Sequence, residues 1–370
     1  MIEDGTLRSR IVPALLGPVF DTEQSADAFA VATAKQRIDE QSTTLDERTP
    51  TVSIVIPTFN RSGLLVNALE SVLGQTFKDY EIIVIDDGST DDTVERLAPY
   101  MDRIRYYYQL NRGVSAALNK GIGVARGKWL SVLASDDVWL PTKLENQLKA
   151  LAELGSEFGA CFTDCSYSGD PHSGLSAFEQ AGLASPLGPT PLNDPMKWVL
   201  AEHLVIWVQS LLVLSSLLRE LNGFDEAMMV GEDTDLLFRL TFKTRFCFVS
   251  APLVRIDRTP SRQRLTDLYA DTSDRSFACQ EYKYRKWLDL RQFEDPVSRT
   301  SVRGSLRSVY YDWIIAKLYA LKLPDALQKI RSLREMDHSY RTIILTLSFR
   351  AGRKLYTTLN AFWWKRATEN

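Results

Sequence analysis

The chain has 370 residues, of which 45% are hydrophobic and 25% are charged, and its formal net charge is −3. This is an ordinary globular composition in a chain long enough for two or three domains. The charge argues against a generally basic nucleic-acid-binding protein, and we expect no nucleic-acid partner, although a local basic patch stays open.

The cysteines and the apolar runs predict the compartment. There are four cysteines, in a spacing that fits neither a zinc site nor a disulfide framework, so we expect small, partly buried apolar side chains in a reducing cytoplasm. The apolar run Ile11–Phe20 is short, contains two prolines and lacks a cleavage site, so it does not read as a signal peptide. No uncharged run reaches the ~18–20 residues of a spanning helix. We therefore expect a cytoplasmic protein, free or bound to the inner face of the cytoplasmic membrane.

Residues 1–50 are predicted to be an N-terminal extension and linker. Ser25–Gln41 has the pattern of an amphipathic helix, and Ser42–Pro50 is a polar segment that ends in proline. Ordered structure is expected to begin at Thr51.

Strands and helices then alternate. Short apolar, β-branched runs predict strands, and apolar residues at helical spacing predict the helices between them. The predicted strands are 53–56, 81–86, 104–110 and 129–134, and the predicted helices are 61–77, 92–100, 113–127 and 141–154. Such alternation implies crossover connections and a mainly parallel sheet flanked by helices, that is, an α/β fold of Rossmann-like type.

Three of the predicted strands end in polar residues. Thr58 and Asn60 follow the first strand, Asp86 and Asp87 end the second, and the pair Asp136–Asp137 follows the fourth. Ligands of parallel sheets bind beyond the carboxyl ends of the strands. Two adjacent carboxylates after a buried strand also need a partner, because burying charge is costly. We therefore expect a binding site at this edge.

The pattern is weaker after residue 155. The Gly-, Ser- and Pro-rich segment 166–195 is predicted to be a long loop, and loops of that length inside a domain are often functional. Apolar segments resume at 196–221, and the sequence beyond about Arg262 is expected to be mostly helical.

One rival pattern is a dinucleotide-binding loop. The sequence "GIGVARG" (Gly121–Gly127) resembles a phosphate-binding glycine loop. Such a loop must follow a strand and open a helix, whereas these glycines end a predicted helix and precede a strand. An oxidoreductase is therefore disfavoured.

Five blocks together resemble glycosyltransferase family 2. They are "VSIVIPTFNR", "SVLGQTFKDYEIIVIDDGSTDDT", "NRGVSAALNKGIGVARGKWLSVLASDD", "LNGFDE" and "GEDTDLLFRL", in the order and spacing of the family, within residues 51–250. The resemblance implies a GT-A fold and an enzyme that transfers a sugar from a nucleotide-sugar donor with inversion. It covers just over half of the chain and fades beyond about Asp257.

The resemblance also implies a donor site. Asp137 corresponds to the metal-contacting carboxylate and Asp136 to the one near the ribose; here the family's Asp-x-Asp reads Ser135-Asp136-Asp137, which leaves fewer carboxylates for the metal. Mn²⁺ or Mg²⁺ would neutralise charge on the leaving diphosphate. The remaining donor-site residues expected from the resemblance are Pro57, Thr58, Phe59, Asn60, Asp87 (at the base), Arg112 and Asn119 (contacting or framing the donor).

The catalytic base is expected at "GEDTDLLFRL". Inversion requires a base that takes the proton of the acceptor hydroxyl. The resemblance makes Asp233 that base and Glu232 the residue that orients it or the acceptor, and it leaves Asp235 as structural. Each carboxylate could instead favour the helix N-terminus.

The C-terminal segment Tyr340–Arg366 is basic and amphipathic, with no acidic residue. It would suit an anionic membrane surface, or it could dock on its own domain or form a dimer contact. We expect four parts: an extension (1–50), a nucleotide-sugar-binding half (51–155), an acceptor-binding half with the base (156–260) and a helical region (261–370). The expected acceptor is a glycan or a lipid-linked glycan. The alternative is a catalytically inactive transferase-fold module that binds or scaffolds.

Overall fold

The computed structural model describes residues 49–169, 174–183, 186, 188–200, 205–259, 273–320 and 322–336. The described residues form two compact units, one up to residue 259 and one from residue 273. The predicted helix Ser25–Gln41, most of the linker and the basic segment after residue 339 lie outside the described residues.

The first unit is built on one sheet of nine strands. Its order is β3-β2-β1-β4-β8-β6-β9-β5, with β7 paired to β9 as well. The strands are β1 (Val52–Thr58), β2 (Tyr80–Asp86), β3 (Arg105–Tyr108), β4 (Trp129–Val132), β5 (Val138–Trp139), β6 (Phe158–Ser168), β7 (Thr190–Leu192), β8 (Leu212–Leu214) and β9 (Arg245–Asp257). The longest ladders are parallel, β1 with β2 and β6 with β9, which confirms the mainly parallel α/β sheet.

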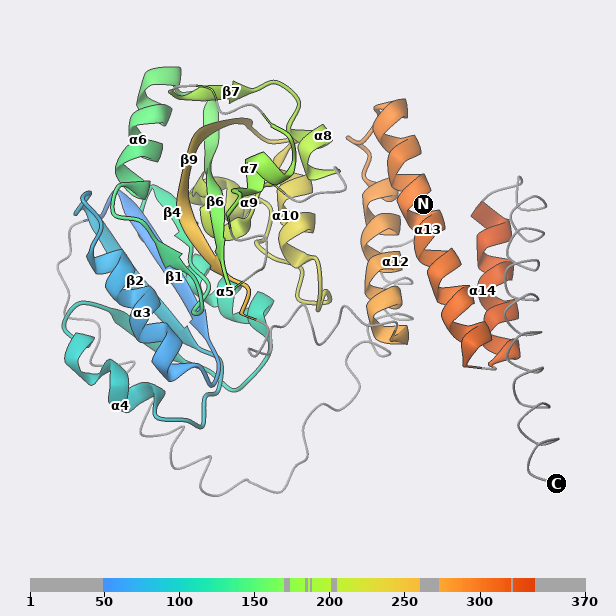
Figure 1. The fold of residues 1–370 in the computed structure, drawn as a ribbon, viewed down its shortest axis with the longest axis horizontal. Helices are drawn as coiled ribbons and strands as arrows, with labels where there is room; N and C mark the ends of the chain where they lie inside the picture. Colours follow the sequence, from blue (N-terminus) through green and yellow to red (C-terminus); the bar gives the residue numbers. More distant parts are fainter. Residues whose placement is uncertain are drawn as a thin grey trace. The chain divides into compact units, whose positions relative to one another are not determined.

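The helices cover both faces of the sheet. They are α3 (Ser62–Leu73), α4 (Thr93–Leu97), η2 (Ala98–Tyr100), α5 (Val114–Val124), α6 (Lys143–Leu154), α7 (Ala177–Gln180), α8 (Pro195–Val199), η3 (Val208–Ser210), α9 (Ser215–Glu220) and α10 (Glu232–Leu240). The chain crosses from β1 to β2 through α3 in one direction and from β3 to β4 through α5 in the other. Because parallel crossovers are right-handed, α3 and α5 lie on opposite faces (Figure 1).

The core strands are hydrophobic because helices cover both of their sides. Val52, Ile54, Val55 and Ile56 of β1 are completely buried. Helix α5 approaches β1 closely at Gly121, where an added Cβ would lie 2.3 Å from the Val55 side chain. Gly121 and Gly127 of the sequence that resembles a phosphate loop therefore allow close packing against β1.

The prediction of one long loop over 166–195 was wrong. Strand β6 continues to Ser168 and pairs with Asp257 of β9, and helices α7 and α8 with strand β7 follow within the segment. The short helices have local signals: Ser176 forms a capping box with Glu179, and Asp194 accepts a hydrogen bond from the Lys197 N–H. These caps indicate order in a segment whose Gly, Ser and Pro content resembles a loop.

The second unit contains helices α12 (Asp274–Asp289), α13 (Pro296–Tyr319) and α14 (Leu323–Met336), as its predicted helical character requires. Leu306, Tyr310, Ile314 and Leu333 form its apolar cluster. A partly buried polar network joins α12 to α13, because Arg285 donates to both Glu281 (2.9 Å) and Tyr310 (2.7 Å). No helix in the described part of the chain combines the length and hydrophobicity needed to span a membrane.

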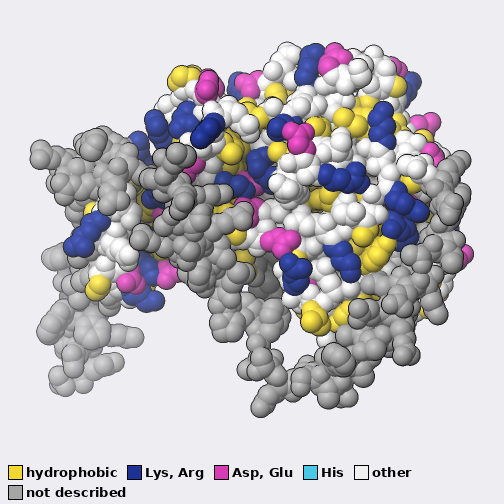
Figure 2. Space-filling view, turned by 180° about the vertical axis from the view of Figure 1, so that it is seen from behind, with side chains coloured by type: hydrophobic (Ala, Val, Ile, Leu, Met, Phe, Trp, Pro, Cys, Tyr) yellow, Lys and Arg dark blue, Asp and Glu magenta, His cyan; other side chains and the backbone are white. Residues whose placement is uncertain are grey.

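The surface of the protein is mixed in charge. Figure 2 shows one face on which Lys and Arg side chains are interspersed with hydrophobic and acidic ones.

All four cysteines, Cys161, Cys165, Cys247 and Cys279, are free and buried, as predicted.

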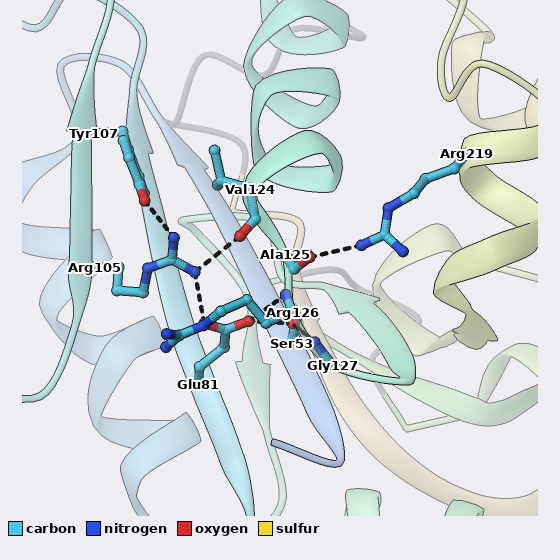
Figure 3. Close-up of polar contacts among 9 residues, drawn as sticks. All are labelled: Ser53, Glu81, Arg105, Tyr107, Val124, Ala125, Arg126, Gly127 and Arg219. Carbon is cyan, nitrogen blue, oxygen red and sulfur yellow. Dashed lines mark hydrogen bonds and ion pairs between the residues drawn. The ribbon is translucent and has the colours of Figure 1, made fainter. Parts of the chain in front are cut away.

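A buried carboxylate anchors the amino ends of the strands. Glu81 accepts hydrogen bonds from the Ser53 hydroxyl (2.6 Å), Arg105 Nη1 (2.7 Å) and both the N–H (2.7 Å) and Nε (3.1 Å) of Arg126. Figure 3 shows these groups converging from β1, β2, β3 and the turn before β4. Burial raises the pKa of Glu81, but the bonds from Ser53, Arg126 and Arg105 outweigh it and lower that pKa below its usual value.

We predict that Glu81→Gln destabilises the protein strongly. The change would leave the guanidinium of Arg105, whose side chain is only 12% exposed, without its anionic partner. Breaking a buried pair in this way costs about 3 kcal/mol or more, measured by urea denaturation. The matched control is Glu157→Gln. Glu157 pairs with Arg245, and both side chains are more than half exposed, so the expected loss is below about 1 kcal/mol. Equal losses in the two variants would contradict the anchoring role of Glu81.

Candidate donor site

The three polar strand ends meet, as the sequence predicts. Strand β1 lies between β2 and β4, and Thr58 is opposite Asp86 in the register of β1 and β2. The Asp87 N–H donates to the Thr58 carbonyl (2.9 Å), which joins the first two ends. The third is tied to them by Arg61, just after β1, whose Nη1 lies 2.5 Å from Asp136 Oδ2.

Asp86 and Asn60 hold the loops of this edge together. Asp86 is completely buried and accepts hydrogen bonds from the Ser89 N–H (2.7 Å) and the Tyr106 hydroxyl (2.6 Å), so it is structural. Asn60 has a left-handed φ of 52°, and its side-chain oxygen accepts from the Thr90 N–H (2.7 Å). Asn60 therefore shapes the loop after β1 from within.

Asp87 anchors the loop between β3 and α5. Its Oδ1 accepts from Gln109 Nε2 (2.7 Å) and the Arg112 N–H (2.9 Å), and its Oδ2 accepts from the Gly113 N–H (2.8 Å). Burial raises the pKa of Asp87 despite these bonds. A carboxylate has about four lone-pair sites, so Asp87 keeps capacity for one more donor.

The residues at the end of β1 differ in exposure and in hydrogen bonding. Pro57 lies within the ladder to β2, while Phe59 is 41% exposed and is therefore not a core residue. Thr58 is buried, and its Oγ1 has no hydrogen-bond partner among the described residues. Unsatisfied buried hydroxyls are uncommon, so Thr58 is a candidate for a ligand contact.

Asp137 is buried between segments distant in sequence. Its side chain accepts from Gln209 Nε2 (2.8 Å, at Oδ2) and from the Asp257 N–H (3.0 Å, at Oδ1), and the residue is only 3% exposed. Burial, followed by the charge of the adjacent Asp136, raises the pKa of Asp137 well above its usual value. A cation beside this pair would offset both effects.

The site fits a hard divalent cation in one specific way. In the described ranges, no three His, Cys, Asp or Glu side chains gather into a metal-binding group. Mg²⁺ often takes only one or two protein carboxylates, and phosphate and water oxygens complete its shell. The oxygen donors of Asp136 and Asp137 suit such a cation when a diphosphate is bound as well.

Arg112 and Asn119 contact the turn before α10. Arg112 Nη2 lies 2.9 Å from Glu226 Oε2. Asn119 donates to the Phe224 carbonyl (2.9 Å) and to Glu226 Oε1 (3.0 Å), and its side-chain oxygen accepts from the Phe224 N–H (2.8 Å). Gly223 is obligatory here, because a Cβ would lie 2.2 Å from the Asn119 side-chain oxygen. Of the two predicted roles, these contacts favour framing over direct donor contact.

The carboxylates of α10 have different environments. Asp235 is completely buried and pairs with Arg239 (2.8 Å), which also donates to the carbonyls of Leu221 and Gly223. Asp235 is therefore structural, as predicted. Asp233 and Glu232 are partly exposed, and Asp233 Oδ1 accepts from the N–H of its neighbour Thr234 (2.6 Å). The helix N-cap is Gly231, which has no side chain to offer, and the Asp233 carboxylate itself accepts from a free N–H of the first turn, which also stabilises the start of the helix.

Sequence reasoning missed three residues of this region. Arg61 lies in a motif block, but nothing in the pattern indicated its pairing with Asp136. Gln209 was part of an apolar run without a functional signal. Arg258 follows β9 directly, and its guanidinium lies 3.7 Å from the centre of the Tyr167 ring and 5.5 Å from that of Trp207. Arg258 is thus a cation next in sequence to Asp257, whose backbone N–H donates to Asp137.

Comparison with known proteins agrees with this arrangement. Residues 53–184 match the sequence profile of "Glycosyl transferase family 2". An uncharacterized glycosyltransferase of Rickettsia prowazekii is 34% identical over 194 residues, which are 51% of this chain and 58% of that protein. The succinoglycan biosynthesis protein ExoO of Rhizobium meliloti is 31% identical over 194 residues, 52% of this chain and 56% of that protein. The chain thus spans little more than half the length of these relatives.

The fold has a counterpart among solved structures. The S. aureus TarS fragment 1–349, crystallised with UDP-GlcNAc, superposes with a TM-score of 0.57 at 16% identity, covering 77% of this chain and 80% of that one. The sheet and its helices therefore define a GT-A fold. Residues 53–184 of the chain thus form a domain that matches glycosyl transferase family 2.

A buried lysine lies in the core of this unit. Lys143 of α6 is completely buried, and its Nζ lies 3.9 Å from the centre of the Trp139 ring. It donates to Ser131 Oγ (3.2 Å) and Gln147 Oε1 (2.8 Å), and no carboxylate pairs with it in the described part of the chain. Burial lowers its pKa from 10.5 to about 7.

We predict that Lys143 makes stability depend on pH. Below pH 7 the lysine is protonated in both the folded and the unfolded state, so the cost of its buried charge is fully present. Between pH 7 and about 10 the folded lysine is neutral while the unfolded one is charged, and the cost falls by up to about 1.4 kcal/mol per pH unit. The free energy of unfolding of wild type relative to Lys143→Met should therefore rise by roughly 2–3 kcal/mol from pH 7 to 9.

The control for this measurement is Lys149→Met on the same helix. Lys149 is exposed and pairs only with Glu153 (3.8 Å), so the difference between wild type and this variant should not change with pH. Denaturant titrations at three pH values suffice. A flat difference for Lys143→Met would mean that this lysine does not titrate in the range.

Proposed function

We propose that the protein is an inverting, metal-dependent glycosyltransferase that moves a sugar from a nucleoside diphosphate-sugar to a hydroxyl. The observation that carries the proposal is the carboxylate pair Asp136–Asp137. The pair follows β4, beside the end of β1. Arg61 pairs with Asp136, and Asp137 is buried with no ion-pair partner in the described part of the chain. Family membership of residues 53–184 supports a donor site at this edge.

The nucleoside would lie over the ends of β1 and β2. Phe59 offers an exposed ring, and Thr58 a buried hydroxyl without a partner in the described structure. Asp87 would use its remaining acceptor capacity on the base while it anchors the loop at Arg112. Asn60 and Asn119 would shape the pocket through the loops that they hold.

A divalent cation, Mn²⁺ or Mg²⁺, would be held by Asp137 and the donor diphosphate. When bound, such an ion neutralises the charge that develops on the leaving diphosphate. The chain's own residues fix both carboxylates: Gln209 and the Asp257 N–H bond Asp137, and Arg61 bonds Asp136, which would lie near the ribose.

Asp233 would take the proton of the acceptor hydroxyl as the sugar bond forms on the face opposite the leaving group. A general base must reach that hydroxyl, and the partial exposure of Asp233 at the start of α10 allows this. Glu232 beside it would orient the acceptor or the base. Residues 51–155 would thus bind the donor and residues 156–260 the acceptor, with 261–370 as a helical region.

The acceptor is proposed to be a glycan, free or lipid-linked. The name of ExoO, a succinoglycan biosynthesis protein, supports a polysaccharide. A peripheral membrane contact through the basic segment after residue 339 stays a prediction from the sequence.

We predict that one nucleoside diphosphate raises the melting temperature in a metal-dependent way. The test compares UDP, GDP, TDP and CDP, each with and without Mn²⁺. At 100 times its dissociation constant, a ligand of the folded state adds about 2.7 kcal/mol, or roughly 5–10 °C. Asp137→Asn should remove the part that needs Mn²⁺, whereas Asp102→Asn, at an exposed site, should not. A wild-type protein indifferent to all four nucleotides would refute the donor site and favour an inactive module.

We also predict that Asp233→Asn abolishes sugar transfer and leaves nucleotide binding unchanged. General base catalysis contributes about 10²–10⁴-fold to the rate, and the amide of asparagine cannot take the proton of the acceptor hydroxyl. Donor hydrolysis or transfer and the thermal shift are measured on the same preparation. Asp235→Asn is the contrasting variant, because it leaves Arg239 unpaired in the core and should lower stability. Loss of nucleotide binding in Asp233→Asn would contradict the base assignment.

A further inference from the structure

Three consecutive carbonyl groups of one short segment are held by side chains of the donor half. The carbonyl of Gln209 accepts from Trp139 Nε1 (3.0 Å), that of Ser210 from Gln147 Nε2 (2.9 Å) and that of Leu211 from Ser131 Oγ (2.5 Å). The donors come from β5, α6 and β4, and the acceptors from η3 and its end. All of these residues are buried.

Lys143 fixes the orientation of the donors. Its ammonium donates to Gln147 Oε1 (2.8 Å), so the amide nitrogen of Gln147 must point the other way, toward Ser210. It also donates to Ser131 Oγ (3.2 Å), so the Ser131 hydrogen is left for Leu211. Its third contact is the face of Trp139 (3.9 Å to the ring centre). We call Lys143, Ser131, Trp139 and Gln147 the clamp.

The held segment carries the side chain that reaches the carboxylate. Gln209 is 8% exposed, and its Nε2 lies 2.8 Å from Asp137 Oδ2. With the backbone of Gln209 fixed by the clamp and the other oxygen of Asp137 held by the Asp257 N–H (3.0 Å), the carboxylate has one orientation. A neutral amide fixes the carboxylate without neutralising it, which leaves the charge for a cation.

We propose that Gln209 is the positioning residue for Asp137, and that the clamp acts on the metal and donor diphosphate through Gln209. The inference rests on the proposed function, since it gives Asp137 the cation. Deleting a group that hydrogen-bonds a metal ligand typically weakens the affinity for the metal about 10–100-fold.

The test is a titration of Mn²⁺ at a fixed, saturating concentration of the nucleoside diphosphate that stabilises wild type best. The quantity measured is the Mn²⁺ concentration that gives half of the nucleotide-dependent rise in melting temperature. In Gln209→Met, which keeps the volume and removes the donor, this midpoint should rise about 10–100-fold. The shift produced by the nucleotide without Mn²⁺ should not change.

Gln75→Met is the matched control. Gln75 is also fully buried and donates to the Leu140 carbonyl (2.8 Å), but it does not contact Asp137. It should lower stability without changing the Mn²⁺ midpoint. A merely structural role for Gln209 predicts the same behaviour in both variants, and that result would overturn the inference.

A double variant tests the route through Gln209. Ser131→Ala by itself should raise the Mn²⁺ midpoint several-fold. In the Gln209→Met background it should add nothing, because the Gln209 amide that the clamp positions is then absent. Full additivity would overturn the route. If Gln209→Met does not fold, the test is made with Ser131→Ala alone, and an unchanged Mn²⁺ midpoint in that variant overturns the inference. A wild type without any Mn²⁺-dependent rise would overturn the metal proposal itself, whereas a normal wild type with an unaffected Gln209→Met overturns only this step.

Discussion

The burial of the Asp137 carboxylate is the constraint on which the arrangement of the first unit depends. A carboxylate that is only 3% exposed is tolerated only if its oxygens are hydrogen-bonded. Its two partners, Gln209 and the backbone of Asp257, belong to the half that follows residue 155. The sheet must therefore continue from β4 through β8 and β6 to β9 for the carboxylate to be satisfied. In this way the strands before residue 155 depend on strands that the chain forms only later.

The two ends of the sheet treat a buried carboxylate in opposite ways. Glu81, at the amino ends, is surrounded by Arg105 and Arg126 and by the Ser53 hydroxyl, and its pKa is lowered. Asp137, at the carboxyl ends, has a neutral amide and a backbone N–H beside it and a second carboxylate next in sequence, and its pKa is raised. Glu81 is electrostatically complete within the protein and stabilises it. Arg61, which pairs with Asp136, offsets only part of the negative charge beside Asp137, and this is the property expected of a site that binds a cation.

The sequence allowed good predictions where the relevant contacts are local or periodic. The strands and helices between residues 53 and 154 follow from apolar periodicity, and the convergence of Thr58, Asp86 and Asp136 follows from parallel topology. The partners of Asp137 could not be predicted in this way, because Gln209 is 72 residues away and Asp257 is 120 residues away. No local pattern encodes pairing over such distances. The strands β6 and β9 were missed for a related reason. Their Cys, Ser, Asp and Arg residues face a sheet interior or a polar edge, so the simple apolar run of a covered parallel strand is broken.

Helix α10 shows how one pattern of acidic residues divides into two roles. Each residue of an α-helix turns about 100°, so Asp233 and Asp235 point in nearly opposite directions. Asp235 faces the core, where Arg239, four residues later, lies on the same side and completes the pair at 2.8 Å. Arg239 in turn holds the carbonyls of Leu221 and Gly223, and so fixes the turn that receives Asn119. The buried carboxylate thus orients the helix against the donor half, and the helical period then directs Asp233 outward.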